Sequence, residues 1–188
     1  MKLLIITLSV FLLSCQETSV KLNKIEKQAL KKEAITLVKK FGGQLKPQLK
    51  KALKSKGPMY AVKVCAKKAP EIAKKINANN SDWNIKRVSL KNRNPNAKPD
   101  SWEEKVLKMF NDRHAKGESA KKMAYSEVVN GKFRFMKAQG TEKVCLTCHS
   151  KNVAQPIKDA IHKYYPNDKA TGYSLGDIRG AFSLTKKL

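Results

Sequence analysis

Residues 145–149 read Cys145-Leu146-Thr147-Cys148-His149, which places two thiols and an imidazole within five positions. Thiols three positions apart lie about one helical turn apart on one side of the backbone. Each thiol can therefore form a thioether with one vinyl group of a porphyrin, and this C-x-x-C-H spacing is the pattern of covalent haem c attachment. The imidazole of His149 follows directly and can bind the iron as its proximal ligand.

Three other kinds of site use cysteines at a similar spacing. A redox dithiol of the thioredoxin type is expected at the start of a helix in a βαβ unit, but no buried parallel strand is predicted before Cys145. A zinc site needs further clustered Cys or His ligands, whereas Cys65, His114 and His162 are scattered along the chain. We therefore favour haem attachment over these two sites and over a structural disulfide.

The first residues have the composition of an export signal. Lys2 is followed by an apolar run over residues 3–13, and Leu12-Leu13-Ser14-Cys15 resembles a lipobox. We expect residues 1–14 to be a lipoprotein signal peptide, Cys15 to carry the diacylglycerol, and residues 15–24 to be a tether. An ordinary cleaved signal with an incidental cysteine is the alternative. Export agrees with the haem motif, because thioether formation to haem takes place outside the cytoplasm.

The predicted location is the periplasmic side of a membrane, with the protein attached through its lipid. Gln16 is not a retention signal, which favours the outer membrane over the inner one. The apolar run of the signal is too short for a permanent transmembrane helix, and no second stretch approaches 18 apolar residues. The remaining chain has the length of one domain, which we place at residues 25–188.

The pattern of apolar residues predicts helices first and then a small antiparallel sheet, an α+β fold with the haem motif at one end. Helices are expected over 22–41, ending at Gly42-Gly43, over 44–55, and from Pro58 to residue 76 with a kink at Pro70 just after Cys65. A strand is expected over 83–90, a helix from Asp100 to about Lys116, and a hairpin over 123–137 with its turn at Asn130-Gly131. A short helix over 156–165 and a strand over 178–185 complete the prediction.

The formal net charge is +25, and almost all of the basic residues are lysines. Such a surface attracts anionic lipid headgroups or acidic protein partners over long distances. Nucleic acid is not an expected partner, because export removes access to it and no aromatic-interleaved binding motif is present. The expected protein partner is a redox protein, and an acidic surface on this partner would complement the basic surface of this protein.

Of the four cysteines, Cys65 is the one that is used neither for lipidation nor for haem attachment. It lies on the apolar stripe of the helix that contains Pro70, so it is predicted to face the interior, where a cysteine is usually a small hydrophobic residue. It is also a candidate for the sixth iron ligand. His114, His162 and the methionines at 59, 109, 123 and 136 are the alternatives from the residues alone, with His114 ahead of His162.

Several separated motifs together resemble a known family, the exported single-haem c proteins with a PAS-like domain. The resemblance covers residues 58–184 and rests on Cys65 with Ala69-Pro70, Arg87-Val88-Ser89-Leu90, Arg93-Asn94-Pro95-Asn96, Pro99-Asp100-Ser101-Trp102-Glu103, Cys145 to His149, Lys169-Ala170-Thr171-Gly172-Tyr173 and Gly176-Asp177-Ile178-Arg179-Gly180-Ala181-Phe182-Ser183. It implies a PAS-like fold and one haem c, with iron bound by His149 and Cys65. Arg87, Arg93 and Arg179 lie in these motifs and are candidates to bind the haem propionates, because guanidinium groups pair with carboxylates in a bidentate way.

Two functions follow from these expectations. A six-coordinate haem with no free position is an electron carrier, which we favour. The alternative is a sensor of redox state or of a diatomic gas, which would act through a separate partner protein. The chain is not expected to be an enzyme, because peroxidase chemistry needs an open position with an acid/base histidine, and no histidine is convincingly placed there.

Overall fold

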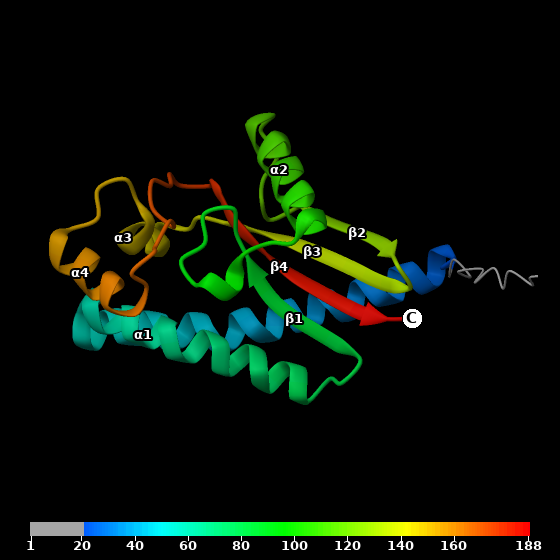
Figure 1. Cartoon of the computed structure of the whole chain (residues 1–188), viewed down its shortest axis with the longest axis horizontal. Helices are drawn as coiled ribbons and strands as arrows, with labels where there is room; N and C mark the ends of the chain where they lie inside the picture. Colours follow the sequence, from blue (N-terminus) through cyan, green and yellow to red (C-terminus); the bar gives the residue numbers. More distant parts are fainter. Residues whose placement is uncertain (1–20) are drawn as a thin grey trace, which may run out of the picture.

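The computed structural model describes residues 21–188. It contains four helices and one four-stranded antiparallel sheet with the strand order β1-β4-β3-β2 (Figure 1). The helices are α1 (Lys24–Ala78), α2 (Ser101–Ala115), α3 (Leu146–His149) and α4 (Gln155–Tyr164), and the strands are β1 (Trp83–Val88), β2 (Ala124–Val129), β3 (Lys132–Gly140) and β4 (Ile178–Lys187). The predicted α+β class is confirmed. The signal peptide 1–14, Cys15 and most of the 15–24 tether lie outside the described residues and stay predictions.

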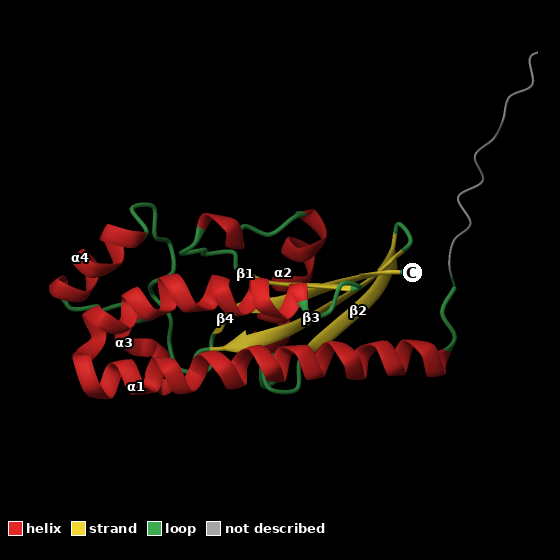
Figure 2. Cartoon of the chain, turned by 90° about the horizontal axis from the view of Figure 1, so that it is seen from below, coloured by secondary structure: helices red, strands yellow, loops and turns green. Residues whose placement is uncertain are grey.

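Helix α1 folds back on itself at Gly57, so that it forms two antiparallel arms (Figure 2). Gly57 has φ 76° and ψ 178° and is the one residue in α1 with non-helical dihedral angles. Such a positive φ costs little for glycine. Pro58 begins the second arm, as predicted, where the missing N–H needs no partner.

The predicted helix end at Gly42-Gly43 was wrong, and the predicted kink at Pro70 does not interrupt the helix. The chain remains helical through Gly42-Gly43 and through Pro70. A glycine inside a helix costs about 1 kcal/mol relative to alanine, but Phe41 before the pair is almost fully buried and Leu45 after it packs on the same core. Around Pro70, Ala69 and Ile72 pack on that core as well. Burial of the continuous apolar face therefore outweighs the local preference to end the helix.

Each face of the sheet is covered by a different helix. Both arms of α1 pack on one face, and α2 packs on the other (Figures 1 and 2). Trp83 and Ile85 of β1 belong to the core under α1, whereas Val88 belongs to the core under α2. Because successive strand side chains point to opposite faces, Arg87 lies on the α1 face, and this places it toward the cavity described below.

The predicted hairpin and the predicted cap of α2 are confirmed. Asn130 and Gly131 both have positive φ, 49° and 65°, and connect β2 to β3 in the tight turn that Asn-Gly favours. Asp100 accepts a hydrogen bond from the N–H of Glu103, and the Glu103 side chain accepts one from the N–H of Asp100. This capping box fixes the start of α2.

The segment after β3 brings the C-x-x-C-H motif to the end of the sheet. A 3-10 turn, Lys143–Cys145, leads directly into α3. Helix α4 then packs on the second arm of α1, where Val153, Ile157 and Ile161 surround Val62. The motif is thereby enclosed between the fold-back of α1, α4 and the sheet. Within residues 21–188, none of the helices has the length and hydrophobicity needed to cross a bilayer.

Candidate functional site

A cavity of about 1590 Å³ lies between α1, the sheet and the motif segment. It exceeds the roughly 300–1,000 Å³ of most small-molecule pockets, so it has room for a large planar group. Seven of the residues predicted to form the site line it: Cys65, Arg87, Arg93, Cys145, Cys148, His149 and Arg179. They come from positions spread over more than a hundred residues of sequence, and folding brings them to one cavity.

The two motif cysteines follow one another on a single helical turn. Cys145 ends the 3-10 turn, and Cys148 lies on α3. Both side chains are half-buried, and neither cysteine forms a disulfide. Burial raises the pKa of the Cys148 thiol above its usual value, with the charge of Arg93 acting in the opposite direction. The pair is available for covalent attachment at the cavity wall.

His149 presents one ring nitrogen to the cavity and uses the other to hold its orientation. Its Nδ1 lies 2.6 Å from the carbonyl oxygen of Ala170, and its Nε2 lies 3.3 Å from Nη1 of Arg179. Burial, together with the positive charges of Arg179 and Arg93, lowers the pKa of His149 to about 2. A neutral imidazole that donates from Nδ1 to a carbonyl has its lone pair on Nε2, where it accepts the Arg179 contact in this structure. This is also the tautomer that binds a metal through Nε2.

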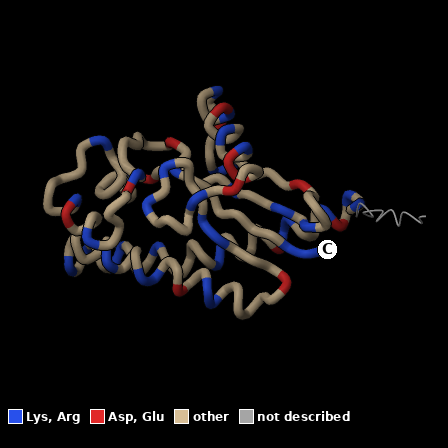
Figure 3. The backbone as a smooth tube through the Cα atoms, viewed as in Figure 1, with Lys and Arg blue, Asp and Glu red and all other residues tan. Residues whose placement is uncertain are grey.

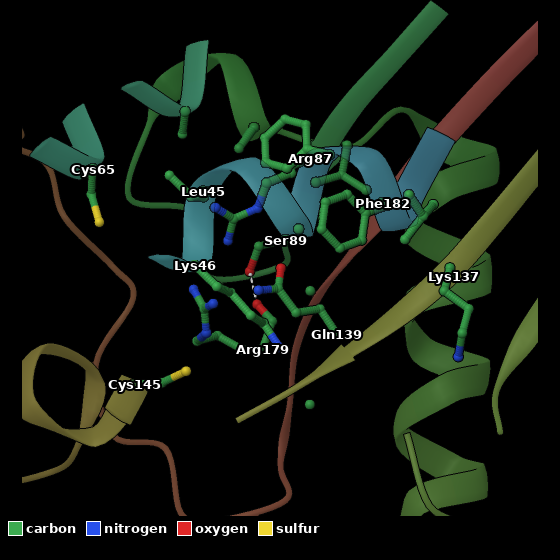
Figure 4. A pocket seen from close by; sticks show the side chains of 18 of the residues that line it. Leu45, Lys46, Cys65, Arg87, Ser89, Lys137, Gln139, Cys145, Arg179 and Phe182 are labelled. Atoms are coloured by element: carbon green, nitrogen blue, oxygen red, sulfur yellow. Dashed lines mark hydrogen bonds between the residues drawn. The ribbon is translucent and has the colours of Figure 1, made fainter. Parts of the chain in front are cut away.

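Cys65 supplies a third thiol from the second arm of α1. Figure 4 shows Cys65 and Cys145 on different walls of the cavity. Arg87 and Arg179 line the same cavity. Burial raises the pKa of Cys65, while the charges of Arg87, Arg179 and Arg93 lower it and that of Cys145 raises it. Cys65 thus lines the same cavity as the arginines and the motif, from which it could act as a ligand to a metal bound by His149.

Arg87 and Arg179 carry buried nitrogen atoms without acceptors. Neither Nε atom has a hydrogen-bond partner among the described residues. Burial, together with the like charge of Arg179, lowers the pKa of Arg87 to about 10. Two neighbouring, half-buried cations that repel one another and each hold a buried Nε without an acceptor are unfavourable alone, so an anionic group in this cavity would stabilise them. Carboxylates such as haem propionates fit this requirement.

Arg93 differs from the other two arginines because its guanidinium group already forms hydrogen bonds with protein groups. Its Nε and Nη2 both lie 3.0 Å from the carboxylate of Asp168, and Nη2 also donates to the carbonyl of Cys148 at 2.7 Å. Arg93 thus lines the cavity as a brace of the motif. Of the three predicted arginines, Arg87 and Arg179 have the freer donors for a carboxylate.

His114 and His162 lie in different surroundings. His114 lines the cavity, but its Nε2 is 3.7 Å from a carboxylate oxygen of Asp177 and its side chain is one-third exposed. His162 is exposed on α4. Neither shares the buried surroundings of His149.

Three residues of the site were missed by the sequence analysis: Tyr165, Asp168 and Tyr173. Tyr165 lines the cavity near Cys65, and burial raises its pKa. The Tyr173 ring packs edge-on against His149, with 6.3 Å between ring centroids. Tyr173 belongs to one of the resemblance motifs, but no pattern gave these side chains a role, because their contacts with the C-x-x-C-H segment are tertiary.

Comparison with known proteins agrees with this geometry. A solved structure described as the crystal structure of the cyanobacterial heme-protein Tll0287 matches with a TM-score of 0.64 and 26% sequence identity, covering 88% of this chain and 97% of that chain. No match was found among curated proteins. A family model described as Tll0287-like matches residues 16–186. The family resemblance inferred from the motifs is confirmed, and the chain belongs to the Tll0287-like family.

Proposed function

We propose that this protein is a lipid-anchored, exported electron carrier with one covalently attached haem c. The observation that carries the proposal is the position of His149. Its Nδ1 is held by the Ala170 carbonyl, and its Nε2 lies in a cavity that also contains two neighbouring cysteines and a third one on another wall. The similar solved structure is described as a heme-protein, which supports haem as the cofactor.

Cys145 and Cys148 would hold the haem through thioethers to its two vinyl groups. Their spacing on one helical turn suits this attachment, and both thiols are free. The guanidinium groups of Arg87 and Arg179 would bind the propionates. This contact would give an acceptor to the buried Nε atoms that otherwise lack one.

His149 and Cys65 would bind the iron from its two sides. When bound, the haem supplies one-electron chemistry between ferric and ferrous iron. An anionic sulfur is a strong donor and stabilises the ferric state. If His149 and Cys65 both held the iron, no coordination position would remain for a substrate, so we propose a carrier and not an enzyme.

The surface charge supports an acidic redox partner. Helix α1 holds sixteen lysines and three glutamates, and Figure 3 shows Lys and Arg recurring along it with few acidic residues between them. Each of these glutamates makes a hydrogen bond or ion pair within the fold, so most of the lysine charge is uncompensated. We propose that the protein acts at the periplasmic side of a membrane. The outer membrane is favoured over the inner one because Gln16, the residue after Cys15, is not a retention signal. We also propose that the protein binds no nucleic acid.

One experiment tests attachment and function together. The full chain is produced with a haem c maturation system, extracted with acid-acetone, and its remaining haem is measured as the pyridine complex. One haem per chain should remain. The reduced protein is then exposed to CO, and a carrier should keep its spectrum because both axial positions are filled.

The Cys65→Ala variant is the matched control, since it should open one axial position and bind CO. Rapid CO binding by the reduced wild type, with a change in its affinity for a partner protein, would support the sensor function instead. Loss of haem on extraction of the wild type would contradict covalent attachment.

A further inference from the structure

Arg93 and Asp168 form a largely buried, two-pronged ion pair beside the motif. Arg93 lies in the loop after β1, and Asp168 lies in the loop between α4 and β4. The Nε–Oδ1 and Nη2–Oδ2 distances are both 3.0 Å, and the two side chains are 14% and 12% exposed. This bidentate geometry is the strong form of an arginine–carboxylate contact.

The pair is connected to His149 by a continuous set of hydrogen bonds. Oδ1 of Asp168 also accepts the N–H of Ala170 at 2.9 Å. The carbonyl of Ala170 in turn lies 2.6 Å from Nδ1 of His149. On the other side, Nη2 of Arg93 donates to the carbonyl of Cys148 at 2.7 Å and lies 3.5 Å from the carbonyl of Ala170. Both flanks of the contact between His149 and Ala170 are therefore fixed by one ion pair.

Other bonds already keep the two segments together. The N–H of Tyr173 donates to the carbonyl of His149, and the N–H of Gly172 donates to the carbonyl of Ser150, each at 3.0 Å. These backbone bonds do not involve Ala170. The ion pair acts on Ala170 itself, because Asp168 accepts from its N–H and Arg93 lies 3.5 Å from its carbonyl oxygen, which faces Nδ1.

We propose that Arg93 and Asp168 are a positioning pair that sets how strongly His149 donates to the iron. By holding the Ala170 carbonyl against Nδ1–H, the pair keeps the tautomer with a free Nε2 and makes this nitrogen a better donor, as outer partners of metal-bound histidines do. The inference rests on the proposed function, since the donor strength of Nε2 is felt only by a bound iron.

The test compares Asp168→Ala and Asp168→Asn in the full haem-loaded chain. Asp168→Ala removes both the partner of Arg93 and the acceptor for Ala170, so His149 becomes a weaker donor and ferric iron is less stabilised. The equilibrium constant for reduction should rise about three- to tenfold, where a tenfold change is ~59 mV for one electron. Asp168→Asn keeps an amide oxygen for the N–H of Ala170 but loses the charge, so its shift should be smaller. The g-values of the ferric low-spin signal should move in the same order.

The control is Asp100→Ala, which breaks the contact of Asp100 with Arg134 at the start of α2. Neither of these side chains lines the cavity. This variant should lower the melting temperature without changing the potential or the g-values. If Asp168→Ala does not fold, Arg93→Lys takes its place, because a lysine keeps the charge without the two-pronged contact, and its potential should also rise.

Two failures can be told apart in this experiment. If the Asp168 and Arg93 variants unfold at lower temperature but keep the potential and g-values of the wild type, the pair is only a structural brace and the inference is wrong. If the wild type itself holds no covalent haem, the proposed function fails first. Covalent haem is measured in every variant as its pyridine complex, so both outcomes are read from the same samples.

Discussion

Nε2 of His149 lies 3.3 Å from Nη1 of Arg179, so the nitrogen that is suited to bind iron faces a guanidinium group. Arg179 lies on β4, and its carbonyl accepts the hydroxyl of Ser89 at 2.8 Å. Because the pKa of His149 is lowered to about 2, the imidazole is neutral and can accept this contact. The contact connects the sheet directly to the motif helix and places a fixed positive charge beside the site.

We expect Arg179→Ala to lower the reduction potential of the haem-loaded protein. A nearby cation disfavours ferric iron, and the loss of its contact with a propionate leaves an uncompensated negative charge. Both effects act in the same direction. The expected fall is about 20–60 mV, or roughly two- to tenfold in the equilibrium constant. A redox titration measures it. Lys105→Ala, which removes an exposed charge on α2, should leave the potential unchanged, and equal potentials for both variants would argue against Arg179 at the haem.

Replacing the motif cysteines should abolish covalent attachment. The double variant Cys145→Ala/Cys148→Ala has no thiol for either vinyl group, so acid-acetone should extract all of its haem. Each single variant should retain at most one thioether, and the pyridine complex should shift because one vinyl group remains unreacted. Covalent haem in the double variant would overturn the assignment of the motif.

The sequence predicted most of the ligand set but little of what holds it in place. Cys145, Cys148 and His149 are adjacent in the chain, so their spacing alone suggests the chemistry. Cys65 and Arg87 could be proposed from periodicity and motif resemblance, and both line the cavity. The bond from His149 to Ala170 joins residues 21 positions apart, with helix α4 between them, and Asp168 acts from the loop after that helix. No local pattern encodes such a contact.

The helical region shows the same limit of local rules. Gly57-Pro58 turns the chain as predicted, because glycine adopts the positive φ of 76° and proline suits a first helical turn. Gly42-Gly43 has an equally strong local preference to end a helix but does not. The difference comes from Phe41, which is 1% exposed and packs edge-on against Phe182 of β4. Helix propensities of individual residues do not include this burial, so they cannot predict that the helix continues through Gly42-Gly43.

Two glycine substitutions should therefore have opposite effects on stability. At Gly42 no atom lies within 4 Å of an added Cβ, and the residue is inside α1, so Gly42→Ala should stabilise the fold by about 0.5–1 kcal/mol. At Gly180 an added Cβ would lie 2.4 Å from the carbonyl oxygen of Val88, where β4 passes β1. Gly180→Ala should cost about 1–3 kcal/mol, since the backbone of one strand must move. Thermal unfolding followed by circular dichroism measures both, and a stabilised Gly180→Ala would contradict the close approach of these strands.

The N-terminal prediction can be tested without the structure. Cells labelled with a radioactive or clickable fatty acid should mark the wild type, and the protein should fractionate with membranes. Cys15→Ala should lose the label because the acylated thiol is gone. Cys65→Ala is the matched control, since it removes a thiol within the domain and should keep the label. Equal labelling of wild type and Cys15→Ala would exclude lipidation at this residue.

The final prediction concerns Cys65 as the sixth ligand. In the ferric wild type, a thiolate opposite His149 should give a low-spin spectrum with thiolate bands in the near infrared. Cys65→Ala should keep its covalent haem but become high-spin or recruit another ligand. Removing an anionic donor also removes its preference for ferric iron, so the potential should rise, with ~59 mV for each tenfold change in the equilibrium constant. Absorption spectra and a redox titration of both proteins measure these changes.

His114→Ala is the control, because His114 also lines the cavity. A spectrum that changes with His114→Ala and not with Cys65→Ala would assign the ligand to the histidine and leave Cys65 as a buried thiol.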